Sequence, residues 1–172
     1  QRSIGKISVI VNCSTISVPN IKFQNSDWEN FKKHYEINIK GSFNIIKVFL
    51  PDWIKSSFGK YVGLTTVYTE NIQSELSGYI TGKSALNGFI RSLATELGPK
   101  GIRMNLVSPG MVDTPLLADV PEKSKLLTAA KTPLRSIANP NDVANAICFL
   151  TSDKSNHING ETIRVNGGYF MG

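Results

Sequence analysis

Four short apolar runs rich in β-branched residues alternate with stretches of helical spacing, and this alternation constrains the fold more than any other feature. The runs cover residues 7–11, 60–64, 102–107 and 162–165. Strands separated by helices form βαβ units, in which the strands pair in parallel and are buried on both faces. The sequence therefore predicts an α/β fold with a parallel sheet.

The segment between the first two runs predicts one long helix. Apolar residues recur at helical spacing from Trp28 to Ile54. Ser26 is a suitable N-cap, and Glu29 lies at its capping-box position. We expect the helix to be irregular near Asn38.

Two further helices are indicated by their ends as well as their apolar faces. Residues 86–97 form one pattern, which stops at the Gly-Pro pair 98–99. Another pattern follows the Asn-Pro pair 139–140. Residues 111–138 contain three prolines and little periodicity, which predicts a mobile segment over a site.

Length and composition favour a single domain spanning residues 1–172, with 41% hydrophobic residues. No apolar run approaches the roughly 20 residues that span a bilayer, and the first residues lack the pattern of a secretion signal. We therefore expect a cytoplasmic protein without membrane contact. The net charge of +6 comes from scattered basic residues, which predicts a solvated surface rather than a nucleic-acid site.

Several isolated residues are interpreted as structural. Cys13 and Cys148 lack CxxC spacing and a neighbouring histidine cluster, so we expect a small packed thiol at Cys13, a buried helix around Cys148, reduced thiols and no metal. His34 and His157 are expected on the surface. We expect both tryptophans, Trp28 and Trp53, to pack against helices.

The chemically most informative pair is Tyr79 and Lys83, at the start of a predicted helix. A separation of four residues places both on one helix face. An ammonium group near a phenol favours the phenolate, which moves the tyrosine pKa toward neutrality and suits proton transfer. By itself this spacing is common, and the alternative is an ordinary amphipathic helix surface.

Two predicted strand ends strengthen this interpretation. Thr66 follows one strand, and Ser108-Pro109-Gly110 with Thr114 follows the next. Open α/β sheets bind ligands at the carboxyl ends of their strands. A hydroxyl at that edge can stabilise negative charge on a substrate oxygen.

Together these segments resemble the short-chain dehydrogenase/reductase family, and within it the 3-oxoacyl-[acyl-carrier-protein] reductases. The matching segments occur in the family's order along nearly the whole chain. They are Asn12 after the first strand, Asn38-Ile39-Lys40-Gly41, Thr66, Tyr79 with Lys83, Ile102-Arg103-Met104-Asn105, Ser108-Pro109-Gly110, and Asn159-Gly160-Glu161-Thr162 through Val165-Asn166-Gly167-Gly168.

The resemblance implies a Rossmann-like three-layer fold and an oxidoreductase that uses NADP or NAD, with NADP favoured. Tyr79 corresponds to the general acid/base, and Lys83 to the residue that holds the nicotinamide ribose and lowers the tyrosine pKa. Thr66 stands where a serine usually orients the substrate oxygen, and Asn38 corresponds to the anchor of a proton-relay water. The implied cofactor-binding residues are Asn12, Tyr79, Lys83, Pro109, Gly110, Val112 and Thr114.

The implied substrate is a 3-oxoacyl thioester of fatty acid biosynthesis, either small or bound to an acyl carrier, and the implied assembly is a homodimer or homotetramer. The basic residues Lys32, Lys33 and Lys40 could contact an acidic carrier protein. Two alternatives stay open. One is the same chemistry on a sugar, steroid or small alcohol, and the other is a non-catalytic subunit or scaffold.

The sequence also departs from the family pattern. No GxGxxG turn occurs, although such a turn brings the backbone close to a dinucleotide pyrophosphate. A sheet of the four predicted strands would leave the 7–11 strand as an unpaired edge, so we expect N-terminal βα units that are missing here. Residues 12–15 read Asn-Cys-Ser-Thr where the family has Asn-Asn-Ala-Gly, and bulkier side chains there predict weaker cofactor binding.

Overall fold

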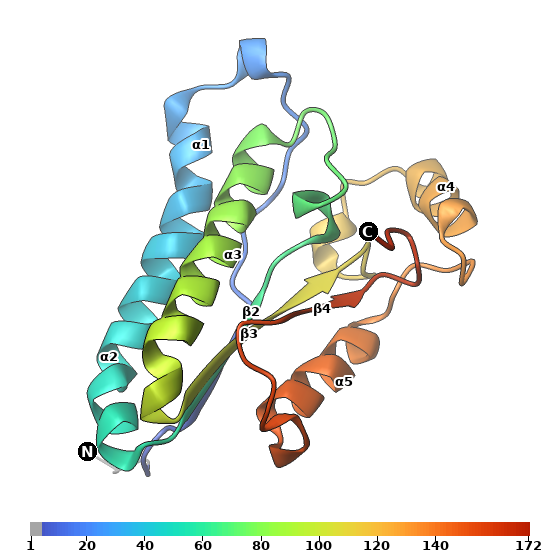
Figure 1. Cartoon of the computed structure of the whole chain (residues 1–172). Helices are drawn as coiled ribbons and strands as arrows, with labels where there is room; N and C mark the ends of the chain where they lie inside the picture. The colour runs from blue at the N-terminus through green and yellow to red at the C-terminus, as the bar shows by residue number, and fades with distance from the viewer. Residues whose placement is uncertain (1–4) are drawn as a thin grey trace.

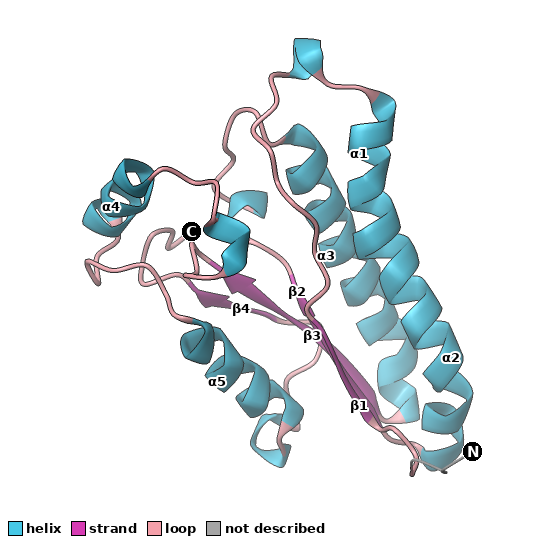
Figure 2. Ribbon diagram, turned by 180° about the vertical axis from the view of Figure 1, so that it is seen from behind, coloured by secondary structure: helices cyan, strands magenta, loops and turns pink. Residues whose placement is uncertain are grey.

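The computed structural model describes residues 5–172, and it contains one four-stranded parallel sheet (Figures 1 and 2). The strand order is β1-β2-β3-β4. Every pairing is parallel, for example Val9 with Lys60 and Gly59 with Ile102. The predicted α/β class is thereby confirmed. The strands are β1 (Val9–Asn12), β2 (Gly59–Leu64), β3 (Ile102–Pro109) and β4 (Thr162–Val165).

Helices cover both faces of this sheet and make the three layers visible in Figure 1. On one face lie α1 (Trp28–Tyr35), α2 (Gly41–Ser56) and α3 (Ser77–Leu97), and on the other lies α5 (Pro140–Thr151). The first interface contains a large core around Trp53, Tyr61 and Ile90. A second core, which includes Val62 and Leu150, lies under α5.

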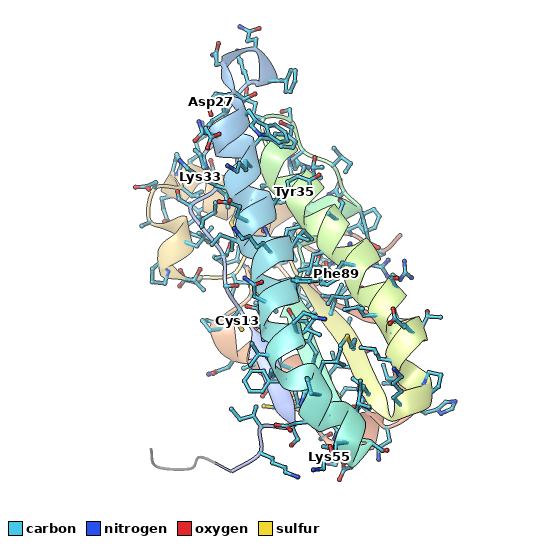
Figure 3. The ribbon with its side chains drawn as sticks, turned by 90° about the vertical axis from the view of Figure 1, so that its left-hand side faces the viewer. Cys13, Asp27, Lys33, Tyr35, Lys55 and Phe89 are labelled. Atoms are coloured by element: carbon cyan, nitrogen blue, oxygen red, sulfur yellow. The ribbon has the colours of Figure 1, made fainter. Side chains whose placement is uncertain are left out.

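The predicted long helix is one continuous run, seen from Asp27 to Lys55 in Figure 3, with an irregular turn at the expected place. A π turn, η2 (Glu36–Lys40), joins α1 to α2 and contains Asn38. The predicted N-cap is wrong by one residue. Asp27, and not Ser26, accepts the backbone N–H of Asn30 at 2.7 Å, because the helix begins at Trp28.

The other predicted helix ends are confirmed. A 3₁₀ turn, η4 (Gly98–Lys100), follows α3 at the Gly-Pro pair. The side chain of Asn139 caps α5 through a complete capping box with Asp142.

Residues 111–138 are more regular than the sequence indicates. They contain a 3₁₀ turn, η5 (Pro115–Leu117), and the ten-residue helix α4 (Glu122–Lys131). The helix escapes a periodicity search because it has no buried residue, and its leucines Leu126 and Leu127 are exposed. Within residues 5–172, none of the helices has the length and apolar content needed to cross a bilayer.

The structural interpretations of single residues have mixed outcomes. Trp53 is buried, and its ring N–H donates to the carbonyl of Ile7 at 2.9 Å. Trp28, in contrast, is 67% exposed and stacks on its helical neighbour Phe31. Both cysteines are free and exposed rather than packed, because Cys13 follows the edge strand β1 and Cys148 lies on an exposed part of α5.

Candidate active site

Tyr79 and Lys83 lie one turn apart near the start of α3. The separation of four residues puts both side chains on the same helix face, as the sequence predicts. Lys83 is only 3% exposed, and Tyr79 is partly buried. The pair is therefore held inside the protein rather than on its surface.

The ammonium group of Lys83 is tied to the end of β2. Its Nζ donates to the carbonyl oxygen of Leu64 at 2.7 Å. Burial lowers the pKa of Lys83 to about 8, and the negative charge of the nearby Cys13 in its thiolate form acts in the opposite direction. Lys83 is therefore a mixture of ammonium and amine in mildly alkaline solution.

Thr66 follows β2 and begins the 3₁₀ turn η3 (Val67–Thr69). It is buried, and its hydroxyl lies near the Tyr79 phenol. Burial raises the pKa of the Tyr79 phenol, and the hydrogen bond from Thr66 opposes that rise. The lowering of this pKa by Lys83 that the family resemblance implies stays a prediction.

Asn38 is buried in the π turn next to α3. Its Nδ2 donates to the carbonyl of His34 at 2.8 Å, and its own carbonyl accepts the Ser42 hydroxyl at 2.6 Å. Isolated π turns inside helices frequently mark functional sites. No direct hydrogen bond joins Asn38 to Lys83 in the described chain, so the water relay stays a prediction.

The side chain of Asn12 is fully engaged within the protein. Its Nδ2 donates to Ser42 Oγ at 3.2 Å and to Tyr61 Oη at 3.1 Å. Its Oδ1 accepts both the backbone N–H and the hydroxyl of Ser14. Any contact of Asn12 with a cofactor would therefore be made by its backbone atoms.

The remaining predicted residues lie at the end of β3 or after it. The backbone N–H of Gly110 donates to Val165 at 3.0 Å. Val112 forms an isolated bridge with Ala138, and Thr114 opens η5. Parallel strands share one carboxyl edge, so the structure brings Asn12, Thr66 and Pro109 to the same edge of the sheet.

Comparison with known proteins finds relatives along nearly the whole chain. A family profile described as Enoyl-(Acyl carrier protein) reductase matches residues 1–170. A 3-oxoacyl-[acyl-carrier-protein] reductase of Buchnera aphidicola is 34% identical over 167 residues, covering 96% of this chain and 67% of that protein. The chain belongs to the short-chain dehydrogenase/reductase family.

Solved structures of the short-chain dehydrogenase/reductase family have the same fold. A 3-oxoacyl-[acyl-carrier protein] reductase from Brucella melitensis matches with a TM-score of 0.91 and 29% identity, over 97% of this chain and 64% of that one. A second structure from that organism, described with bound NAD, matches with a TM-score of 0.89 and 28% identity.

The chain spans about two thirds of the length of the curated relatives it matches. For example, it covers 66% of a 3-oxoacyl-[acyl-carrier-protein] reductase from Thermotoga maritima, which is 31% identical over 166 residues. An acetoacetyl-CoA reductase from Allochromatium vinosum is 29% identical over 170 residues.

One residue beside the pair lies where the sequence of this short-chain dehydrogenase/reductase does not predict it. His34 is buried, and the prediction of a surface position is wrong. Its ring packs edge-on against Tyr79, with 5.9 Å between the ring centroids. The sequence signal for this burial lies in α3, where the glycines Gly78 and Gly82 have no side chain and so leave room for α1. A Cβ on Gly82 would come within 3.0 Å of His34 Cβ.

Proposed function

We propose that this protein is an NAD(P)H-dependent reductase of carbonyl compounds, with Tyr79 as the proton donor. The observation that carries the proposal is the cluster of the partly buried Tyr79 with the buried Lys83 and Thr66 beside the carboxyl edge of the sheet. Ligands of open α/β sheets bind at this edge.

Each residue of the cluster has a role in the proposed reaction. Tyr79 would donate its phenolic proton to the carbonyl oxygen of the substrate. The hydroxyl of Thr66 would orient that oxygen and stabilise the negative charge that develops on it. Lys83 would hold the cofactor ribose, and Asn38 would anchor the water through which the proton is replaced.

The residues at the strand ends suit a nicotinamide cofactor, which when bound supplies the hydride. An ammonium group has three N–H donors, and Leu64 accepts only one from Lys83, so donors are left for ribose hydroxyls. Ser108 Oγ is buried at the end of β3 and has no hydrogen-bond partner among residues 5–172. The family resemblance favours NADP over NAD, and Pro109, Gly110, Val112 and Thr114 would line the nicotinamide end.

We propose a 3-oxoacyl thioester as the substrate. The support is the activity of the relatives, which are 3-oxoacyl-[acyl-carrier-protein] reductases and an acetoacetyl-CoA reductase. An acidic carrier would meet the exposed Lys33, because Lys32 and Lys40 already lie 3.9 Å from Glu29 and Glu36. By resemblance, the enzyme would act in the cytoplasm as a homodimer or homotetramer.

The test is the initial rate of NADPH and NADH oxidation by the complete gene product, with acetoacetyl-coenzyme A as substrate. We expect a rate that depends on both the thioester and the reduced cofactor. Oxidation with a sugar, a steroid or a small ketone but not with the thioester would move the proposal to the other substrate class. Cofactor binding without turnover of any of these would favour the scaffold alternative.

A further inference from the structure

An ion pair joins the turn after β2 to strand β4. Arg164 lies on β4, and Glu70 directly follows η3, 94 positions earlier in the chain. The Nε of Arg164 donates to Oε2 of Glu70 at 2.8 Å, and Nη2 donates to Oε1. Such a two-pronged contact fixes the direction of both side chains as well as their separation. Since β4 lies two places from β2 in the sheet, the contact bridges the end of β3.

The arginine is held on its own strand and by an aromatic ring. Arg164 pairs in register with Ser108, and its guanidinium carbon lies 5.9 Å from the centre of the Phe170 ring. The backbone carbonyl of Phe170 accepts the side chain of Asn166 at 2.9 Å. Ion pairs at the surface usually contribute little to stability, so we expect the effect of this one in the orientation of the turn.

The turn that the ion pair holds is the one that carries Thr66. The backbone N–H of Thr69 donates to the carbonyl of Thr66 at 3.1 Å, and the Thr69 hydroxyl donates to the same oxygen at 2.9 Å. The next N–H, that of Glu70, donates to the carbonyl of Val67 at 3.1 Å. A rotation of the backbone at Glu70 would therefore move Thr69 and, with it, Thr66.

A second contact ties the same turn to α3, the helix of Tyr79 and Lys83. Asn87 Nδ2 donates to Thr69 Oγ1 at 3.3 Å. The turn thus has one side-chain contact to α3 and another to β4. Contacts to two separate elements restrict its rotation more than either contact alone.

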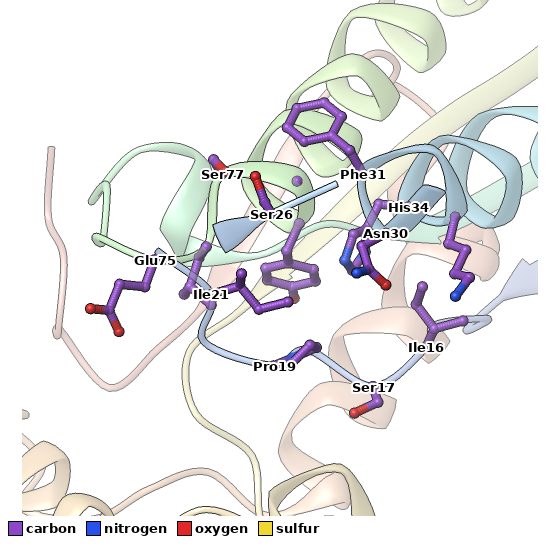
Figure 4. A pocket seen from close by; sticks show the side chains of 14 residues that line it. Ile16, Ser17, Pro19, Ile21, Ser26, Asn30, Phe31, His34, Glu75 and Ser77 are labelled. Carbon is purple, nitrogen blue, oxygen red and sulfur yellow. The ribbon is translucent and has the colours of Figure 1, made fainter. Parts of the chain in front are cut away.

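Neither residue of the ion pair lines the cavity beside Tyr79. This cavity of about 270 Å³ lies between the loop after β1, α1 and the turn that leads into α3 (Figure 4). Glu70 and Arg164 are not among its lining residues. An influence of the pair on a substrate beside Tyr79 would therefore act through the turn and Thr66.

We propose that Glu70 and Arg164 are positioning residues, which hold the η3 turn so that the Thr66 hydroxyl faces the substrate oxygen beside Tyr79. The inference rests on the proposed function, in which Thr66 orients that oxygen. Displacement of an orienting group by about 1 Å can lower a rate strongly, even when the change lies away from the reacting atoms. The pair thus acts on the reaction without contacting the substrate.

The first test is a double-mutant cycle in the complete gene product, with acetoacetyl-coenzyme A and NADPH. Arg164→Met and Glu70→Ala should each lower the turnover number about fivefold, and the double variant no further, because each change removes the same contact. The Michaelis constant for NADPH and the midpoint of thermal unfolding should stay close to the parent values. Arg91→Met is the matched control and should keep full turnover, since Arg91 is an exposed arginine whose charge also lowers the pKa of Glu70.

Dependence on Thr66 separates positioning from a general effect on the enzyme. In a Thr66→Val background, Arg164→Met should cost no further turnover, because the hydroxyl that the pair positions is already absent. A further fivefold loss in that background would overturn the proposal. Normal turnover of Arg164→Met in the parent background would overturn it as well.

Hydrogen exchange followed by mass spectrometry gives a measurement that needs no turnover. In Arg164→Met, the peptide that contains residues 66–71 should take up deuterium at least about threefold faster, whereas a peptide from α5 should keep its rate. Unchanged exchange at the turn would contradict the proposal. If the parent protein reduces no carbonyl compound, the proposed function fails, and faster exchange at the turn still supports the positioning of Thr66 by the ion pair.

Discussion

The buried ammonium of Lys83 and the carbonyl oxygen of Leu64 are 2.7 Å apart, so a charged group joins helix α3 to the end of strand β2. This contact takes up one lysine donor, and burial raises the pKa of the Tyr79 phenol on the same helix face. The proton-transfer cluster is thus anchored to the sheet through its lysine.

Lys83 should make folding stability depend on pH in the alkaline range. Its pKa is about 8 in the folded protein and ordinarily 10.5. Above pH 8, Lys83 therefore binds more protons in the unfolded chain than in the folded protein. Stability should therefore rise between pH 8 and about 9.5 by about 1 kcal/mol per pH unit. Urea unfolding of the protein and of Lys83→Met measures this. The variant should lack the rise, and Lys47→Met, at an exposed position, should keep it.

Tyr79→Phe should lower the rate of carbonyl reduction by at least about 100-fold, because the proton donor is removed. Nicotinamide binding, followed by cofactor fluorescence, should stay within about threefold, since the ring remains. Tyr35→Phe, on α1, is the matched control and should retain normal turnover. Near-normal turnover in Tyr79→Phe would show that another group supplies the proton.

Thr66→Val should lower the turnover number by roughly 100-fold, whereas Thr66→Ser should retain most of it, because only the hydroxyl is needed for the substrate oxygen. The threonine also caps η3, so the valine variant should lose about 1 kcal/mol of stability. Steady-state kinetics with parallel thermal unfolding separates the two effects. Equal activity of both variants would remove Thr66 from the proposed mechanism.

Gly59→Ala should destabilise the fold by about 1–3 kcal/mol through overpacking. A Cβ at this position would lie 2.6 Å from the ring of the buried Trp53. Gly88→Ala is the matched control, since nothing lies within 4 Å of its added Cβ. That substitution in α3 should stabilise the protein by roughly 0.5–1 kcal/mol. Urea unfolding measures both changes in stability, from the shift of the transition midpoint when the dependence of the unfolding free energy on urea is the same in each variant.

Lys33→Glu should raise the Michaelis constant for a carrier-bound substrate several-fold and leave that for the coenzyme A thioester unchanged. Its charge is exposed and makes no ion pair within residues 5–172. Lys100→Glu, beyond the far end of α3, is the control. Added salt should reduce the difference, because screening weakens exposed charges. A Michaelis constant insensitive to both salt and Lys33 would exclude carrier docking at this face.

The sequence predicts most of the layered fold because the strands and α3 have strong local signals. The apolar runs predict the first and last residue of each strand to within two residues, and Gly98-Pro99 predicts the end of α3. The helix α4 is missed because it packs with no buried face, so it leaves no periodic pattern.

The candidate site is predicted only in part, because some of its contacts join distant segments. The spacing of Tyr79 and Lys83 is a local property of one helix and is visible in the sequence. The burial of His34 depends on how closely α1 approaches α3 at Gly82, which involves two separate segments. The direction of the Lys83 ammonium likewise depends on where β2 ends.

The π turn between α1 and α2 makes this region sensitive to insertions and deletions. Each residue of an α-helix advances the side-chain direction by about 100°, and a π turn holds one residue more than an α-turn. Deleting a residue at Glu36–Lys40 would rotate the preceding turns by that angle and carry His34 away from Gly82. The segment should therefore accept exchanges of residue type more readily than changes in length.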